Sequence, residues 1–264
     1  QHETLWDSAA KELGMLLEAF GQHTFALTEW SVDQLNSDEL IRVGIYADSN
    51  QSFIPALEHF RKAIAKDSSD VAPYLEMAKI YNRYKDPAAI ENLSYAPAQT
   101  SEVKTELAKA HFLQGNIDEA VTLVDQVLKE SPDLRSAQLL DLQLRHAQGD
   151  TSVLGEAELL QAQYPIWPAA LVFLLELYGS KQDWGKGNQL ITRAMSFNNQ
   201  NAELWYQYAV YSRAWSLSED AGFGAIKAIE LTPDPKRRVQ IQREFEVEII
   251  EAIDKSKRPF ISEG

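Results

Sequence analysis

Apolar and small residues recur along this chain in paired helical stripes, with a repeat of about 34 residues. Residues 101–134 define the unit. Its positions four, seven, eight and eleven lie on one face of a first helix, and positions twenty, twenty-four and twenty-seven on one face of a second. Small residues at positions eight and twenty, here Ala108 and Ala120, let the two helices approach closely. Neither helix can bury its stripe alone, so the pattern predicts helix pairs that stack on their neighbours.

The same register returns along most of the chain. The predicted units are 37–70, 71–100, 101–134, 135–167, 168–201 and 202–235. Trp205 and Ala209 show the register in the last unit, at positions four and eight. The second unit is short, because a helix that starts after Pro87 meets Pro97 within about three turns, and proline cannot continue a helix.

An amphipathic helix is predicted on each side of the repeats. The first, over 4–20, places on one face Trp6, Ala9, Ala10, Leu13, Leu16, Leu17 and Phe20. The second is a single helix over 236–256, with an apolar face made of Val239, Phe245, Ile249 and Ile253. Terminal repeats need a polar outer face, so both helices fit capping roles. A helix lying on a membrane is the competing interpretation, and the mixture of basic and acidic residues in 236–256 argues against it.

This pattern resembles the tetratricopeptide repeat (TPR) over residues 37–235. The resemblance implies an all-α fold, a right-handed α-solenoid of about six TPR-like helix-turn-helix units with N- and C-terminal capping helices. The expected organisation is an N-terminal helical cap over 1–36, the TPR-like superhelix over 37–235, and a C-terminal capping helix and tail over 236–264.

Composition and charge exclude some classes of binding partner. The 264 residues have a net charge of −14, which would repel a phosphate backbone, so we expect no nucleic acid partner. No apolar run approaches the roughly 20 residues that span a bilayer, so no direct membrane insertion is expected. The first residues, QHETLWDSAA, have neither the basic end nor the apolar block of a secretory signal. The absence of cysteine suits an exported bacterial protein, which favours the bacterial periplasm or envelope over the cytoplasm.

No residue pattern predicts catalysis. The five histidines lack metal-ligand spacing, and His111 takes position eleven, where packing tyrosines stand in other units. Gly222 and Gly224 lie inside a predicted second helix with no strand before them, so they are interpreted as packing glycines rather than a dinucleotide loop. Gly187 takes the small-residue position twenty. We therefore expect no catalytic residue, no cofactor and no metal, and a protein that is not an enzyme.

The TPR resemblance also implies where a partner binds. In that family, positions two, five, nine, twelve and thirteen of the first helices face a concave groove. The partner-binding candidates at these positions are Lys79, Asn82, Arg83, Lys109, Phe112, His146, Tyr206 and Arg213. Counter-charges on the same face are Asp38, Asp48, Glu102, Glu176 and Glu203.

The middle of this face is locally basic, because Lys79, Arg83 and Lys109 lie there on an otherwise acidic protein. The pattern favours an acidic or carboxylate-bearing peptide, with Phe112 and Tyr206 as apolar anchors. The alternative interpretation is a solvated inner wall whose charges only keep the protein soluble.

Together these features predict a non-catalytic protein–protein interaction scaffold or adaptor. It would bind a peptide segment or a partner subunit in its concave groove, within a bacterial envelope assembly. Two alternatives stay open: a recruiting or regulatory domain of a larger enzyme, and a self-assembling structural protein. Self-association is compatible with each of them.

Overall fold

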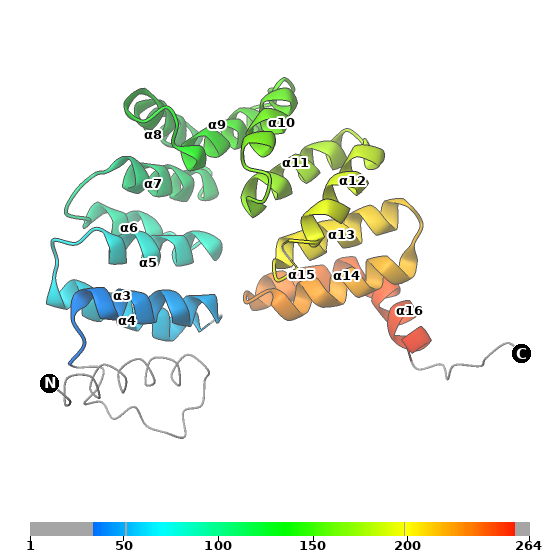
Figure 1. Ribbon diagram of the computed structural model, residues 1–264, viewed down its shortest axis with the longest axis horizontal. Helices are drawn as coiled ribbons and strands as arrows, with labels where there is room; N and C mark the ends of the chain where they lie inside the picture. The colour runs from blue at the N-terminus through cyan, green and yellow to red at the C-terminus, as the bar shows by residue number, and fades with distance from the viewer. Residues whose placement is uncertain (1–33, 51, 198, 257–264) are drawn as a thin grey trace, which may run out of the picture. The chain divides into compact units, whose positions relative to one another are not determined.

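The computed structural model describes residues 34–50, 52–197 and 199–256 (Figure 1). Within these ranges the chain forms fourteen α-helices and no β-strand, which confirms the predicted all-α repeat fold. The helix predicted over 4–20, with the N-terminal cap, lies outside the described residues. None of the described helices is both long and apolar enough to cross a membrane.

The helices follow one another with short connections. The first seven are α3 Ser37–Ser49, α4 Phe53–Lys66, α5 Ala72–Arg83, α6 Ala88–Ser94, α7 Ser101–Leu113, α8 Ile117–Glu130 and α9 Arg135–Ala147. The next seven are α10 Val153–Gln163, α11 Pro168–Ser180, α12 Trp184–Met195, α13 Ala202–Ala214, α14 Ser218–Leu231, α15 Pro235–Glu244 and α16 Glu246–Ser256. With seven residues, α6 is as short as Pro97 led us to expect.

Local sequence signals set where several helices begin. Asn36 and Glu39 form a reciprocal capping box at the start of α3. The side chains of Thr100, Asn201 and Asp234 accept hydrogen bonds from backbone N–H groups in the first turns of α7, α13 and α15. Each of these contacts satisfies a donor that the helix itself leaves unpaired.

The turn between paired helices uses one backbone conformation in the five units whose turn the structure describes in full. Gly115 and Gly149 have φ values of 84° and 92°, in the left-handed region that glycine adopts without steric cost. Lys85, Gln182 and Ser216 have φ values of 53°, 56° and 58°. All five residues take position fifteen of their units, so the helix pair imposes this turn whether or not glycine is present.

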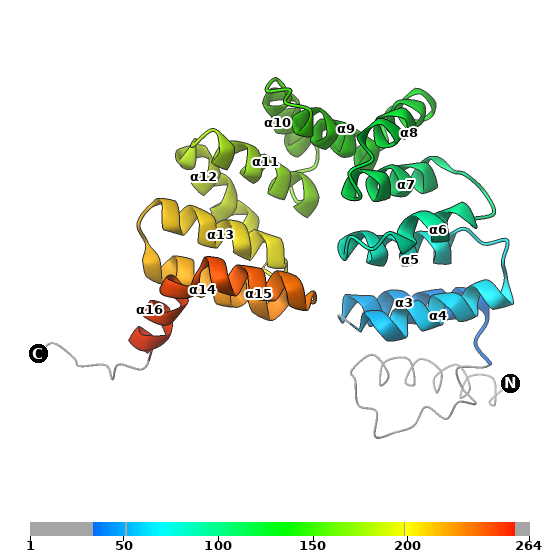
Figure 2. The same ribbon diagram turned by 180° about the vertical axis from the view of Figure 1, so that it is seen from behind.

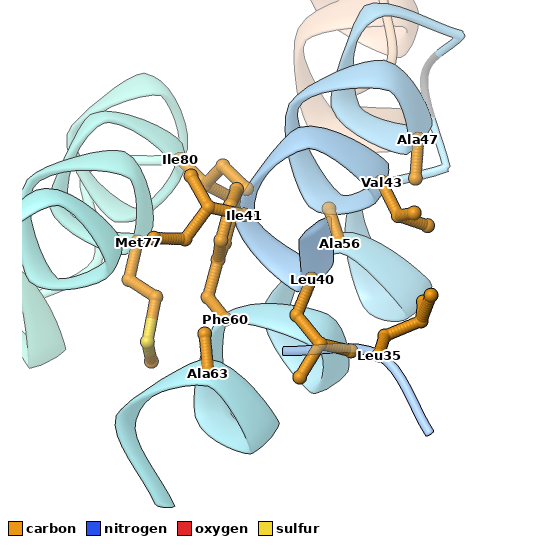
Figure 3. Packing of buried hydrophobic residues seen from close by; sticks show 10 residues of the cluster. All are labelled: Leu35, Leu40, Ile41, Val43, Ala47, Ala56, Phe60, Ala63, Met77 and Ile80. Atoms are coloured by element: carbon orange, nitrogen blue, oxygen red, sulfur yellow. The ribbon is translucent and has the colours of Figure 1, made fainter. Parts of the chain in front are cut away.

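The chain divides into two compact units, residues 1–144 and 145–264. In the first, α3 packs with α4, α5 with α6 and α7 with α8, and α5 lies between its neighbours α3 and α7. Figure 3 shows how the stripes of α3, α4 and α5 meet in one core, where the packed side chains are Leu35, Leu40, Ile41, Val43, Ala47, Ala56, Phe60, Ala63, Met77 and Ile80. Burial of each large apolar side chain contributes about 1.5–3 kcal/mol.

In the second unit, α11 packs with α12 and α13 with α14. Both α15 and α16 pack against α14 (Figure 2). The core here is built from small residues closed by two large ones, and consists of Ala209, Ala221, Ala225, Ala228, Ile241 and Phe245. The alanines allow the helices to approach closely, and Ile241 and Phe245 seal the end of the unit.

The predicted packing role of the helical glycines is confirmed. A Cβ at Gly187 would overlap the ring of Tyr211, and one at Gly222 would overlap the backbone carbonyl of Glu248. A Cβ at Gly224 would lie 2.8 Å from the Tyr208 ring. These glycines mark sites where two elements touch, and they do not form a dinucleotide loop.

The C-terminal cap differs from the prediction of one helix over 236–256. The structure has two helices, and the chain bends at Phe245, whose φ and ψ are −114° and 24°. Phe245 itself is buried in the core together with Ile241. Val239, which lies on the side of α15 opposite Ile241, is 45% exposed, and Ile253 of α16 is 38% exposed.

Candidate functional site

The predicted partner-binding residues belong to both compact units, and each set is described by itself. The first unit holds Lys79, Asn82, Arg83, Lys109 and Phe112, and the second holds His146, Tyr206 and Arg213.

In the first unit, helices α3, α5 and α7 form a continuous wall, called here the α3–α5–α7 wall. Position eight of α5 and α7 is fully buried, as Ala78 and Ala108. Position nine is exposed on all three helices, where it is Ile45, Lys79 and Lys109. The wall therefore presents two cationic side chains and one apolar side chain to solvent. Ile45, 42% exposed, was not among the predicted residues, although the same register identifies it.

Two predicted residues of this wall join neighbouring helices. Arg83 forms a two-pronged ion pair with Asp48 of α3, with both N···O distances 2.8 Å. This hydrogen bonding raises the pKa of the Arg83 guanidinium, and burial opposes the shift. Asn82 is buried, and its Nδ2 donates to the backbone oxygen and the carboxylate of Glu106 at 3.0 and 2.9 Å. Both side chains therefore hold α5 against the flanking first helices.

The other residues of the wall remain accessible. Lys79 pairs with Glu76 one turn earlier at 2.5 Å, and exposed pairs of this kind contribute little to stability. Lys109 is exposed and has no ion-pair partner in the described part of the chain. Phe112, one turn after Lys109, is half-buried against the core around Ala108. Lys109 and Phe112 thus place a cation beside an apolar surface.

Because Arg83 supports the wall, its charge reversal should destabilise the fold. In Arg83→Glu two carboxylates would face each other at Asp48, and we expect the free energy of unfolding to fall by about 1 kcal/mol. Urea denaturation followed by circular dichroism measures this change. The reciprocal variant Asp48→Arg/Arg83→Glu should recover most of the loss. Equal stability of Arg83→Glu and wild type would show that the ion pair is dispensable.

In the second unit, the predicted residues of α13 are covered by the chain's own C-terminal helices. Arg213 donates to the Glu248 carboxylate, and its guanidinium lies 3.7 Å from the centre of the Phe245 ring. The Tyr206 hydroxyl donates to the Glu244 carboxylate at 3.1 Å. Burial and the charge of Glu244 raise the pKa of the Tyr206 hydroxyl. These two residues therefore dock α15 and α16 onto α13.

Glu176 of α11 lies near one carboxylate, Glu203, and one guanidinium, Arg237. Burial raises its pKa to about 7, repulsion from Glu203 adds to the shift, and Arg237 opposes it. Arg237 pairs with Glu203 at 3.5 Å and stacks 4.3 Å from the centre of the Tyr206 ring. Glu176 therefore lies close to a second carboxylate, Glu203, whose charge Arg237 partly offsets.

The raised pKa of Glu176 predicts a pH dependence of stability. Between its ordinary value of 4.5 and about 7 the folded chain binds a proton that the unfolded chain has released, so stability falls as pH rises through this window. Much of the surface of this side chain is exposed, so solvent screening should limit the effect to less than about 1 kcal/mol. Glu176→Gln should flatten the profile, measured as urea midpoints from about pH 4.5 to pH 8. A profile unchanged by the substitution would assign the dependence to other groups.

The histidines that the structure describes show no metal-binding arrangement. His146 is exposed near the end of α9, with its ring 6.0 Å from Phe173 in an edge-on contact. His111 is half-buried, and its Nδ1 lies 3.3 Å from the side-chain nitrogen of Asn116. Among the described residues, no group of histidine, aspartate and glutamate side chains could hold a metal ion.

No family model and no curated protein matches this sequence. Solved structures do match its fold. A tetratricopeptide repeat protein from Parabacteroides merdae aligns with 91% of this chain and 98% of its own length, at 14% identity and a TM-score of 0.66. Yeast Tom70 aligns with 95% of this chain and 61% of its own, at 13% identity and a TM-score of 0.61.

Two further structures share the fold. A chain of the APC/C hetero-tetramer Cut9-Hcn1 aligns at 12% identity and a TM-score of 0.60, and the alignment covers 90% of this chain but about half, 48%, of that one. PilW, described as a widely conserved type IV pilus biogenesis factor, aligns at 16% identity and a TM-score of 0.54 over 82% of this chain and 98% of its own. With its paired helices and recurrent turn, this chain therefore has a tetratricopeptide-repeat-like fold.

Proposed function

We propose that this protein is a non-catalytic scaffold that binds an acidic or carboxylate-bearing segment of a partner protein on the α3–α5–α7 wall. The observation that supports this function is the exposed ammonium group of Lys109 beside the half-buried ring of Phe112. A carboxylate can pair with Lys109 without breaking an ion pair within the described chain. An apolar side chain of the same segment can then rest on Phe112.

The remaining predicted residues take different parts in this proposal. Lys79 supplies a second cation, because its exposed pair with Glu76 can exchange partners at little cost. Asn82 and Arg83 hold α5 against α7 and α3, and so keep the three helices of the wall in place. Tyr206 and Arg213 hold the C-terminal helices, so a partner would reach them only by displacing α15 and α16. His146, exposed on α9, is a further candidate contact.

We propose a bacterial envelope assembly as the setting. The complete absence of cysteine suits an exported protein. The fold similarity to the pilus biogenesis factor PilW is compatible with such a setting. In this role the protein would hold an envelope component in place and catalyse no reaction.

Site-specific photo-crosslinking tests the location of the binding surface. A photoreactive residue replacing Lys109 on α7 should capture a partner from extract of the native source, and the same residue replacing Lys129 on the second helix α8 should not. The variant Lys79→Glu/Lys109→Glu should lose the partner in a pull-down. The matched variant Lys62→Glu/Lys129→Glu reverses two exposed lysines on second helices and should retain it.

Circular dichroism should show the same helix content for both double variants, since all four lysines are exposed. Retention of the partner by Lys79→Glu/Lys109→Glu, or capture at position 129 in preference to position 109, would move the binding surface away from the α3–α5–α7 wall.

A further inference from the structure

The outer side of α15 is cationic. Ile241, Phe245 and the half-buried Arg237 face the core side of this helix. At 100° per residue, the opposite side holds Lys236, Val239 and Arg243. All three are exposed, Val239 by 45%. No acidic residue lies on this side of α15, which is unexpected on a chain with a net charge of −14.

The outer side of α16 has the opposite character. Glu248, Ile249 and Ala252 form the partly buried side of this helix. The opposite side carries two exposed apolar residues and three exposed carboxylates, and consists of Glu246, Val247, Ile250, Glu251 and Asp254. Val247 and Ile250 are 65% and 53% exposed. No basic residue lies on this side.

The charges of these two outer sides are not used within the described chain. The C-terminal helices do form internal ion pairs, but with other residues: Arg237 with Glu203, Glu248 with Arg213, and Lys255 with Glu219. Among the described residues, no ion pair involves Lys236, Arg243, Glu246, Glu251 or Asp254. Both helices rest on α14, so these outer sides face away from α14 (Figure 2).

We propose that α15 and α16 form the interface of a symmetric dimer, in which α15 of each copy contacts α16 of the other. A two-fold axis pairs every contact with its reciprocal. The cationic side of α15 in each copy then meets the anionic side of α16 in the other copy, so the charges of all four sides are neutralised. It also covers Val239, Val247 and Ile250 of both copies.

A second copy fits this surface better than a uniformly charged partner does. An anionic surface that attracts α15 would be repelled by α16, which directly follows it in the chain. A cationic partner that attracts α16 would be repelled by α15. A second copy presents both signs, and a two-fold axis brings them together in the required order.

The small area of the proposed interface limits the affinity of the dimer. Two short helices from each copy bury an area at the low end for protein interfaces, so we expect a dimer that forms at about 10–300 µM rather than an obligate one. At physiological ionic strength the repulsion between two acidic molecules is screened beyond about 8 Å. The complementary charges at the contact then decide the pairing.

Sedimentation equilibrium with the full chain and two charge-reversal variants tests the arrangement. Wild type should dimerise reversibly. Lys236→Glu/Arg243→Glu makes both outer sides acidic, and Glu246→Lys/Glu251→Lys makes both basic, so each variant alone should dimerise at least about tenfold more weakly. An equimolar mixture of the two should recover dimers, because each α15 then meets an α16 of opposite charge.

Three controls accompany the test. Lys62→Glu/Lys129→Glu applies an equal change of net charge far along the chain and should dimerise like wild type. Val247→Ser/Ile250→Ser removes exposed apolar groups and should weaken the dimer at unchanged helix content. Partner capture by a photoreactive residue at position 109 should be the same in Lys236→Glu/Arg243→Glu, since this dimer is independent of the proposed binding wall.

Three results would overturn the proposal. The first is a wild-type chain that stays monomeric to about 300 µM, above the range expected for a specific weak dimer. The second is a dimer that survives both charge reversals, and the third is a mixture of the two variants that fails to associate.

Discussion

Replacement of Phe245 by alanine should lower the free energy of unfolding of the second compact unit by about 3–5 kcal/mol. The Phe245 ring is fully buried between α13, α14 and the two C-terminal helices. It meets Tyr206 edge-on at 5.9 Å between ring centres, and the Arg213 guanidinium lies over its face. Alanine would leave a cavity and remove both contacts, because Phe245 alone fills the bend between α15 and α16.

Urea denaturation and amide hydrogen exchange measure this effect. We expect the amides of α15 and α16 to lose protection first, since Phe245 and Ile241 are the fully buried apolar side chains of this described segment. Phe245→Leu keeps most of the apolar volume and should cost less than half as much. Val239→Ala removes an exposed side chain from the same cap and should stay within about 0.5 kcal/mol of wild type. A Phe245→Ala protein as stable as Val239→Ala would show that the cap does not depend on this ring.

A methyl group at Gly187 should lower the free energy of unfolding by about 1–5 kcal/mol. Its Cβ would overlap the ring of Tyr211, which is 2% exposed and donates through its hydroxyl to the Leu175 backbone oxygen at 2.7 Å. Trp184 packs edge-on against the same ring at 5.4 Å. Overpacking of this kind costs about 1–3 kcal/mol, and breaking the buried hydrogen bond adds about 1–3. The higher helix propensity of alanine offsets only about 1 kcal/mol of this loss in stability.

Gly185 provides a matched control for this prediction. It lies two residues away in the same helix, and a Cβ there meets nothing within 4 Å. Gly185→Ala should therefore leave stability unchanged or raise it by up to about 1 kcal/mol. Combining Gly187→Ala with Tyr211→Leu should cost less than the sum of the two single changes, because the smaller side chain makes room for the methyl group. Strict additivity would contradict the proposed clash.

The behaviour of the partner-facing residues has a common cause. Asn82 and Arg83, at positions twelve and thirteen of α5, form contacts with the two flanking first helices: Asn82 with Glu106 of α7, and Arg83 with Asp48 of α3. Position nine lies further from the junctions, which leaves Lys79 and Lys109 accessible. The accessible cations of the α3–α5–α7 wall are therefore those at position nine of α5 and α7.

The sequence by itself determined the helix pairs, their spacing and the kind of fold. An apolar stripe with a period of 3.6 residues can be buried only against a neighbouring helix, and its recurrence every 34 residues or so specifies a stack. The packing roles of Gly187 and Gly222 follow from the same register, since they take or follow the small-residue positions of second helices. The short α6 follows from two prolines.

Only the tertiary structure decided which charged residues stay accessible and how the C-terminus is built. Arg83 and Asp48 are 35 residues apart, and the position of one helix along the other determines whether their side chains meet. The contacts of Tyr206 and Arg213 with Glu244 and Glu248 likewise depend on a bend at Phe245. The uninterrupted amphipathic pattern of 236–256 does not reveal that bend, because it places Phe245 on the apolar face whether the chain forms one helix or two.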